Sequence, residues 1–230
     1  RQRIPCMVRG ESNALRRRKL WVRLAHRALL SRYAAFLAIG KANRQFYLSN
    51  GVPERKIFST PYCVDNDRFG AQAEEARRRR DDHRAGWGIP KRAEVFLFCA
   101  KFIPKKRPLD LLEAFSLAVH GRDPAHPPLH LLMVGDGELR RRCEEEAAVR
   151  RLPVTFAGFL NQNQIATAYA AADCLVLPSD HGETWGLVVN EAFASGIPAI
   201  VSDAVGCHPD LIVEGRTGYT FPLGDPRALA

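Results

Sequence analysis

The segment DCLVLPSDHGETWGLVVNEAFASGIPAIVSD (residues 173–203) places an apolar run on each side of a longer run that also reads as buried. Residues 173–178 and 198–203 are almost continuously apolar rather than alternating, which is typical of parallel strands covered on both faces. Residues 185–196 between them have little polar surface and favour a central helix. A strand, a helix and a second strand in this order predict a right-handed crossover.

The same alternation extends back to residue 94. We expect strands at 94–100, 129–135 and 153–158, which alternate with helices at 107–120, 137–150 and 161–172. The sequence therefore predicts an α/β fold with a doubly wound, Rossmann-like parallel sheet. Such sheets bind ligands at the carboxyl ends of their strands.

The N-terminal part of the chain predicts a smaller unit. Residues 35–40 are typical of a strand, a helix is expected from Lys41, and a further strand begins in KIFSTPYCVD. We interpret 1–66 as the remnant of an N-terminal domain, 67–93 as a charged connecting segment and 94–230 as the main domain. The chain starts at Arg1 and stops inside what reads as a helix, so we interpret it as a fragment truncated at both ends.

Composition excludes several classes of protein. The chain is 46% hydrophobic and 26% charged, and no apolar run approaches the roughly 20 residues of a membrane span. Its six cysteines are scattered, which indicates core packing in a reducing compartment and no metal site. The sequence also lacks a phosphate-loop motif, and in VGDGEL the third glycine of the dinucleotide fingerprint is replaced by Arg140.

The net charge of +9 is concentrated at one end of the chain. Residues 1–60 hold 14 Lys or Arg and 2 acids, so +12, which leaves 20 and 23, so −3, for the remainder. Within this segment, residues 14–33 predict a basic amphipathic helix. Two interpretations stay open: a solvated face, which is the more common, or peripheral association with an anionic membrane. Nucleic acid is disfavoured because no recognisable module or aromatic stacking pattern is present.

Two glutamates, one before and one within the helix predicted at 185–196, are candidates for a functional role. Glu191 lies in the apolar helix, where an unpaired carboxylate would cost several kcal/mol. It is either a hydrogen-bonded structural acid or a cleft residue that accepts ribose hydroxyls. Glu183 either offsets the helix dipole or points at a substrate before that helix. Gly186, Leu187 and Val188 would offer free backbone N–H groups to an anion.

A basic cluster follows the strand at 94–100. Lys101, Lys105, Lys106 and Arg107 lie between this strand and the next helix, at the same edge of the sheet. One such cation would be an ordinary solvated side chain. Four cations beside a helix N-terminus indicate a diphosphate site.

Glu183 and Glu191, with seven residues between them and GIPAIVSDAVGCHPDLIVEGRTGYTFPLGD after them, resemble the donor-binding domain of family 4 glycosyltransferases of the GT-B fold. The resemblance covers residues 94–230, and AFLAIGKANRQFYLSNGVPERKIFSTPYCVDNDRF resembles the end of the family's acceptor-side N-terminal domain. Cys207 and Asp210 depart from the family's usual Gly-Gly and Glu, so we assign them no role. The family's N-domain histidine is expected to lie outside this chain.

The resemblance also implies a set of binding roles. Glu191 would bind the donor ribose, and Glu183 would act catalytically at the transferred sugar. The diphosphate would meet Lys101, which is usually Arg in the family, and Lys106 together with the amides of 186–188. The base would meet the backbone of Gly158 to Leu160.

The implied activity is transfer of a sugar from a nucleoside-diphosphate sugar to a hydroxyl of a glycan or lipid-linked acceptor, with retention of configuration and without a metal. This activity suits polysaccharide biosynthesis in the cytoplasm or at the cytoplasmic membrane surface. Two alternatives stay open: a nucleotide-sugar epimerase of the same fold, and a non-catalytic module that binds an anionic membrane or nucleic acid.

Overall fold

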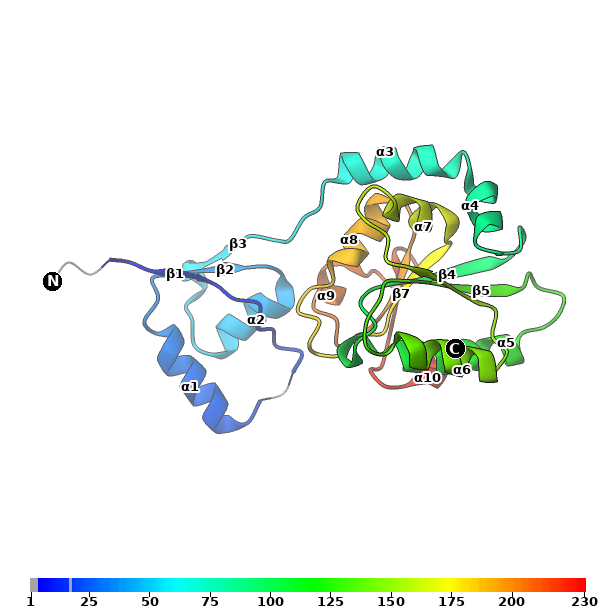
Figure 1. Ribbon diagram of the computed structural model, residues 1–230. Helices are drawn as coiled ribbons and strands as arrows, with labels where there is room; N and C mark the ends of the chain where they lie inside the picture. Colours follow the sequence, from blue (N-terminus) through cyan, green and yellow to red (C-terminus); the bar gives the residue numbers. More distant parts are fainter. Residues whose placement is uncertain (1–3, 17) are drawn as a thin grey trace.

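The computed structural model describes residues 4–16 and 18–230, which form two lobes, each built on a parallel sheet (Figure 1). We call residues 4–16 and 18–64 the small lobe and residues 65–230 the large lobe. In the described residues, the small lobe holds a sheet of order β1-β2-β3, and the large lobe holds one of order β6-β5-β4-β7-β8-β9.

The large sheet confirms the predicted doubly wound α/β fold. Its strands are β4 (Glu94–Cys99), β5 (Leu129–Val134), β6 (Val154–Gly158), β7 (Cys174–Leu177), β8 (Ala199–Ser202) and β9 (Gly218–Phe221). All neighbouring pairs run parallel. The consecutive residues Leu131, Leu132 and Met133 are all fully buried, which requires a cover on both faces of the sheet.

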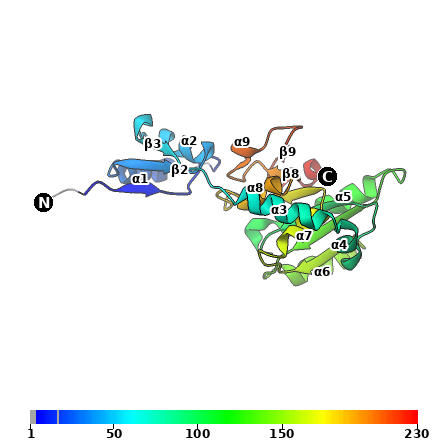
Figure 2. The same cartoon turned by 90° about the horizontal axis from the view of Figure 1, so that it is seen from above.

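Helices supply that cover on both faces, and the view from above in Figure 2 shows α3 and α7 lying across one of them. One face packs against α5 (Pro108–Gly121), α6 (Arg140–Val149) and α10 (Pro226–Leu229), and the other against α3 (Asn66–Arg77), α4 (Arg80–Gly86), α7 (Ile165–Ala171) and α8 (Leu187–Ala194). The chain passes outward from β4 to β5 and β6, then returns to place β7 on the other side of β4. This reversal makes the carboxyl ends of β4 and β7 a topological switch point, where open α/β sheets bind ligands.

The small lobe is a three-stranded layer with two helices. It contains β1 (Met7–Arg9), α1 (Leu20–Leu30), β2 (Ala35–Ala38), α2 (Lys41–Ser49), a 3₁₀ turn at Glu54–Lys56 and β3 (Ile57–Ser59). Phe36, Phe46 and Tyr47 form the centre of its apolar core. The strand predicted at 35–40 and the helix predicted from Lys41 are both present, and the strand ends two residues earlier than expected.

The basic helix predicted over 14–33 is wrong at its start, because α1 begins only at Leu20. The Arg18 guanidinium donates to the backbone oxygens of Asn13 at 2.7 Å and Arg16 at 3.2 Å, so side-chain bonds engage carbonyls in a non-helical segment. Arg17, which the prediction also includes, lies outside the described residues.

The predicted connecting segment at 67–93 is mostly helical, and its helices pack against α7 and α8 within the large lobe. Asp65 caps α3 by accepting the Arg68 N–H at 3.0 Å, and the apolar side of α3 contacts α7 and α8. In α4, the buried Arg84 donates to the Ala171 oxygen at 2.9 Å and pairs with Asp173 at 2.8 Å. Because this segment is rich in charged residues, its sequence shows little sign of the few apolar positions that make its helices amphipathic.

Candidate functional site

Two neighbouring pockets open at the switch point between β4 and β7. We call the first the charged pocket; its cavity measures about 270 Å³ and is lined by Glu11, Tyr62, Cys99, Lys106, Glu183, Thr184, Trp185, Gly186, Leu187 and Val188. We call the second the Glu191 pocket; its cavity measures about 330 Å³ and is lined by Val64, Asp65, Arg68, Phe69, Cys99, Leu160, Asn161, Gln162, Ile165 and Glu191. Cys99, the last residue of β4, lines both, so the two pockets adjoin.

The loops after β4 and β7 bring a cation and a carboxylate together in the charged pocket. Lys106 ends the 3₁₀ turn Pro104–Lys106, and its Nζ pairs with Glu183, with the two side chains 15% and 13% exposed. The Asp180 N–H donates to the Lys105 oxygen at 2.8 Å, which joins one loop to the other. The ion pair therefore sits on a backbone held by both strands.

A close backbone contact at Gly206 holds the loop that carries Glu183. The Gly206 N–H donates to the Glu183 oxygen at 3.0 Å, and a Cβ at Gly206 would lie only 1.8 Å from the Thr184 oxygen. No side chain larger than hydrogen fits at that contact. The segment after β8 therefore holds the backbone at Glu183 and Thr184 in place.

The N-terminus of α8 opens into the same pocket. Gly186 precedes the helix with φ = 100°, a left-handed conformation that glycine adopts without strain. Leu187 and Val188 follow at the first helical positions, where backbone N–H groups have no acceptor within the helix. Those amides and Lys106 line one pocket, an arrangement suited to an anion.

Glu191 combines the two interpretations that the sequence left open. Tyr169 donates its hydroxyl to Glu191 Oε2 at 2.6 Å, and the same carboxylate lines its pocket. Burial raises the pKa of Glu191, while the hydrogen bond from Tyr169 opposes that rise. Glu191 is therefore both a hydrogen-bonded acid and an accessible acceptor.

The structure separates the remaining predicted residues. Leu160 lines the Glu191 pocket, whereas Gly158, with φ = 73°, accepts the Gly135 N–H at 2.8 Å and lines neither pocket. Lys101 is exposed and likewise lines neither. Of the other predicted cations, Arg107 pairs with Asp110 through Nε at 2.7 Å.

Several pocket residues were not predicted from the sequence, among them Cys99, Arg68, Glu11 and Tyr62. Cys99 could have been found, because it ends a predicted strand at the predicted edge; burial raises its pKa to about 12, so it stays a thiol. Arg68 comes from the segment treated as a connection and donates to Gln162 at 3.3 Å. Glu11 and Tyr62 come from the small lobe, and only the contact between the lobes places them here.

The contact between the lobes involves Asp210, one of the two residues that depart from the family pattern. Both carboxylate oxygens of Asp210 accept the backbone N–H of Lys41, at 3.1 and 3.0 Å, and Lys41 Nζ donates to the Pro209 oxygen at 2.8 Å. Asp210 thus caps helix α2 of the other lobe. Cys207 is buried, and its Sγ lies 4.0 Å from the Gly186 oxygen, so it packs beneath the start of α8.

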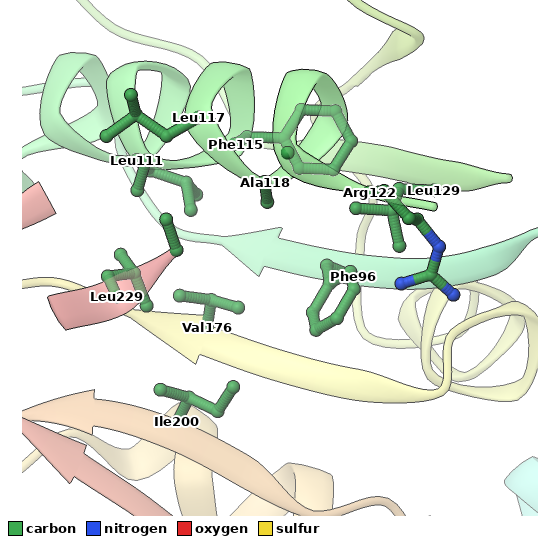
Figure 3. A pocket seen from close by; sticks show the side chains of 13 residues that line it. Phe96, Leu111, Phe115, Leu117, Ala118, Arg122, Leu129, Val176, Ile200 and Leu229 are labelled. Carbon is green, nitrogen blue, oxygen red and sulfur yellow. The ribbon is translucent and has the colours of Figure 1, made fainter. Parts of the chain in front are cut away.

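A larger cavity of about 460 Å³ lies elsewhere, between α5 and the face of the sheet (Figure 3). Its lining is apolar except for Arg122, which bonds to Glu94 at 2.7 Å. A polar, charged ligand would find no further charged partner among its lining residues. We therefore place the functional site at the two smaller pockets.

Among residues 4–16 and 18–230, no helix is both long and apolar enough to cross a bilayer. The same residues bring together no group of three or more His, Cys, Asp or Glu side chains that could hold a metal ion.

Known proteins resemble this chain in sequence. The family model of glycosyl transferases group 1 matches residues 79–230, about two thirds of the chain. A GDP-mannose-dependent alpha-mannosyltransferase of Mycobacterium tuberculosis is 33% identical over 206 residues, which cover 89% of this chain and 47% of the relative. The sulfoquinovosyl transferase SQD2 of Arabidopsis thaliana is 38% identical over 102 residues, 43% of this chain and 19% of the relative. The chain spans about half the length, or less, of these curated relatives.

Solved structures share the fold. The Anabaena protein HepE, solved with UDP and glucose, superposes with a TM-score of 0.70 at 18% identity, over 98% of this chain and 60% of its own. Sucrose-phosphate synthase of Thermosynechococcus elongatus superposes with a TM-score of 0.69 at 24% identity, over 97% of this chain and 56% of its own. These matches show the predicted GT-B fold.

Proposed function

Because the chain belongs to the group 1 glycosyltransferases, we propose that its two pockets bind a nucleoside-diphosphate sugar and that the complete gene product transfers the sugar to an acceptor hydroxyl. This proposal rests on the two pockets being neighbours, since Cys99 lines both. One pocket offers the Glu191 carboxylate and the other an anion site, which matches a ribose joined to a diphosphate.

Each part of the donor then has a partner. The ribose hydroxyls donate to Glu191, and the base lies against Leu160 and the backbone from Gly158. The diphosphate meets Lys106 and the amides at the start of α8, while Lys101, which lines neither pocket, contributes its charge from outside them. The transferred sugar lies against Glu183 in the charged pocket.

The chemistry follows from the charge that develops on the leaving group. As the bond between the anomeric carbon and the diphosphate breaks, negative charge grows on the phosphate oxygens. The acceptor oxygen bonds to the same carbon, and its hydroxyl proton passes to a leaving phosphate oxygen. Lys106 and the helix amides are already in place to stabilise that charge. We propose that transfer proceeds with retention and that these groups take the role a metal ion fills elsewhere.

We propose that the acceptor is a glycan or a lipid-linked glycan. The exposed surface of α1 supports the lipid-linked form. Its apolar side chains Leu20, Trp21 and Leu24 are 69%, 68% and 59% exposed and lie beside cations such as Lys19 and Arg23. A basic amphipathic helix of this kind binds anionic lipid surfaces. The proposed location is the cytoplasmic face of a membrane, and sedimentation with anionic but not neutral vesicles is the expected result.

The donor site is tested by a thermal-shift panel of this chain with UDP, GDP, ADP and CDP. The panel includes GDP and UDP because one relative is named for GDP-mannose and the HepE structure was solved with UDP. One nucleotide at about 100 times its dissociation constant should add about 2.7 kcal/mol to the unfolding free energy. We expect the shift to survive EDTA and to vanish in Glu191→Ala.

The epimerase alternative has its own readout. An epimerase would return a labelled donor with an altered sugar and would need no acceptor, whereas a transferase yields a labelled glycoside. Product analysis with the complete gene product separates the two, and absence of a nucleotide shift in a folded sample would contradict both.

A further inference from the structure

Glu11 brings a second carboxylate into the charged pocket from the opposite lobe. It follows β1 and is one of two acids in residues 1–60; the other, Glu54, pairs with Arg44 away from the cleft. Across the pocket stand Lys106, Glu183 and the start of α8. The small lobe therefore contributes a charged wall where the transferred sugar lies in the proposed complex.

Two hydroxyl groups of the protein already donate hydrogen bonds to the Glu11 carboxylate. Tyr62 donates its hydroxyl to Oε1, and Thr184, from the large lobe, donates to Oε2 at 2.8 Å. The bonds from Tyr62 and Thr184 lower the pKa of Glu11, against the opposing effect of burial, so the side chain is ionised at neutral pH. An ionised carboxylate has about four acceptor positions, so further hydroxyl groups can bind.

We propose that Glu11 accepts hydrogen bonds from hydroxyl groups of the transferred sugar, and that Glu11 and Glu183 together select a neutral sugar over an acidic one. This inference rests on the proposed function, because it assumes that a sugar nucleotide occupies the two pockets. Hydroxyls of a neutral hexose satisfy both carboxylates. A hexuronate would bring a third carboxylate into a pocket whose lining carries two carboxylates, Glu11 and Glu183, and one cation, Lys106, so repulsion outweighs attraction.

A purely structural role is the competing explanation for Glu11. Its bond to Thr184 joins the two lobes, and loss of that bond could slow turnover with any donor. Such a role would reduce activity with neutral and acidic donors by the same factor. Contact with the sugar instead changes the ratio between the two, because only the sugar differs.

The test compares Glu11→Gln with wild type in the complete gene product. Glutamine keeps the size and an acceptor oxygen but removes the charge. We measure the Kd of the free nucleoside diphosphate, and kcat/KM for a neutral hexose donor and for a hexuronate donor of the same nucleotide. Glu54→Gln is the matched control, because Glu54 is 73% exposed and lies outside the pockets.

We expect Glu11→Gln to bind the free nucleotide within about twofold of wild type, because Glu11 lies on the sugar side. The neutral donor should lose about tenfold or more in kcat/KM, as befits a hydrogen bond to a charged group. The preference for neutral over acidic donor should narrow by a similar factor, while Glu54→Gln matches wild type.

Each other outcome has a distinct meaning. An unchanged ratio of the two donors overturns the inference, whether or not both rates fall. Nucleotide binding by wild type together with unchanged sugar-donor kinetics in Glu11→Gln overturns the inference and leaves the proposed donor site standing. A folded wild type that binds no nucleoside diphosphate overturns the donor site itself.

Discussion

The two walls of the charged pocket are built in different ways. The large-lobe wall consists of Lys106, Glu183 and the start of α8, all held by loops that leave neighbouring strands of one sheet. The small-lobe wall consists of Glu11 and Tyr62, which reach the pocket only through contact between lobes. The sheet and its loops hold the residues of the first wall in place, whereas contact between the lobes holds those of the second. Substitutions in the two walls should therefore differ in their effects on activity and stability.

The largest effect is expected at Lys106 in the sheet-built wall. Lys106→Ala removes a fixed cation from the proposed diphosphate site and leaves the Glu183 carboxylate, 13% exposed, without its partner. We expect kcat of the complete gene product to fall about 100- to 1,000-fold, the usual cost of losing a preorganised group at a developing charge. The rate of transfer from a labelled donor measures this effect.

Lys91→Ala is the matched control, because Lys91 is 79% exposed and pairs with Asp81 away from both pockets. It should retain wild-type turnover. A fall of less than about tenfold in Lys106→Ala would be too small for an electrostatic contact at the transition state. That outcome would remove Lys106 from the diphosphate site.

The next effect concerns the hydrogen bond behind the Glu191 pocket. Tyr169→Phe removes the hydroxyl that donates to Glu191 Oε2 and should lower the free energy of unfolding by about 1–3 kcal/mol near neutral pH. Burial already raises the pKa of Glu191 above its ordinary 4.5, and loss of the bond raises that pKa further.

The sign of the pH dependence follows from this raised pKa. The folded protein binds the Glu191 proton more tightly than the unfolded chain, so its stability falls as pH rises above about 4.5. The loss in Tyr169→Phe should therefore be greatest at neutral pH and shrink towards pH 4.5. Urea unfolding across this range measures it, with the exposed Tyr219→Phe as control. A loss independent of pH would mean that Tyr169 acts by packing alone.

The sequence could predict the sheet-built wall because its physical causes are local. Apolar runs such as 94–100 and 173–178 indicate strands, and parallel strands end at a common edge. Lys106, Glu183 and Gly186 each follow such a run within a few residues, and the structure brings them together. Lys101 also follows a strand, but it is exposed and lines neither pocket, because strand position does not determine where a loop side chain lies.

The docked wall could not be predicted in the same way. Glu11 lies 172 residues before Glu183, and no pattern in residues 1–60 distinguishes its carboxylate from that of Glu54. The lobes meet through single contacts such as Lys41 with Asp210, for which sequence periodicity gives no signal. The charged segment 67–93 also gave little signal of its helices, because in α3 few apolar residues, including Phe69 and Ala73, suffice to anchor a helix.

A smaller effect is expected at the contact that docks the second wall. Helix α2 begins after Gly40 and has no side-chain cap from its own lobe, while a Cβ at Gly40 would lie 2.4 Å from the Trp185 ring. Asp210 supplies the cap across the interface, so Asp210→Ala should cost about 1 kcal/mol of unfolding free energy. Amide hydrogen exchange should rise at the start of α2 and stay unchanged in β5.

Asp225→Ala is the matched control within one lobe. Asp225 caps α10 by accepting the N–H groups of Arg227 and Ala228, both at 3.0 Å. It should cost a similar free energy and leave exchange in α2 unchanged. If Asp210→Ala also leaves that exchange unchanged, the cap does not hold the lobes, and the docked wall depends on Glu11 and Thr184 instead.

The smallest effect is expected at Lys101, which tests the sheet-built wall from within a single loop. Lys101 and Lys106 carry the same charge five residues apart, yet only Lys106 lines the charged pocket. An exposed charge contributes about 0–1 kcal/mol, so Lys101→Ala should lower kcat/KM by no more than about fivefold, and less at high salt. A loss equal to that of Lys106→Ala would mean that the loop after β4 rearranges around the donor. The sheet-built wall would then depend on the ligand for its final order, as the docked wall depends on the opposite lobe.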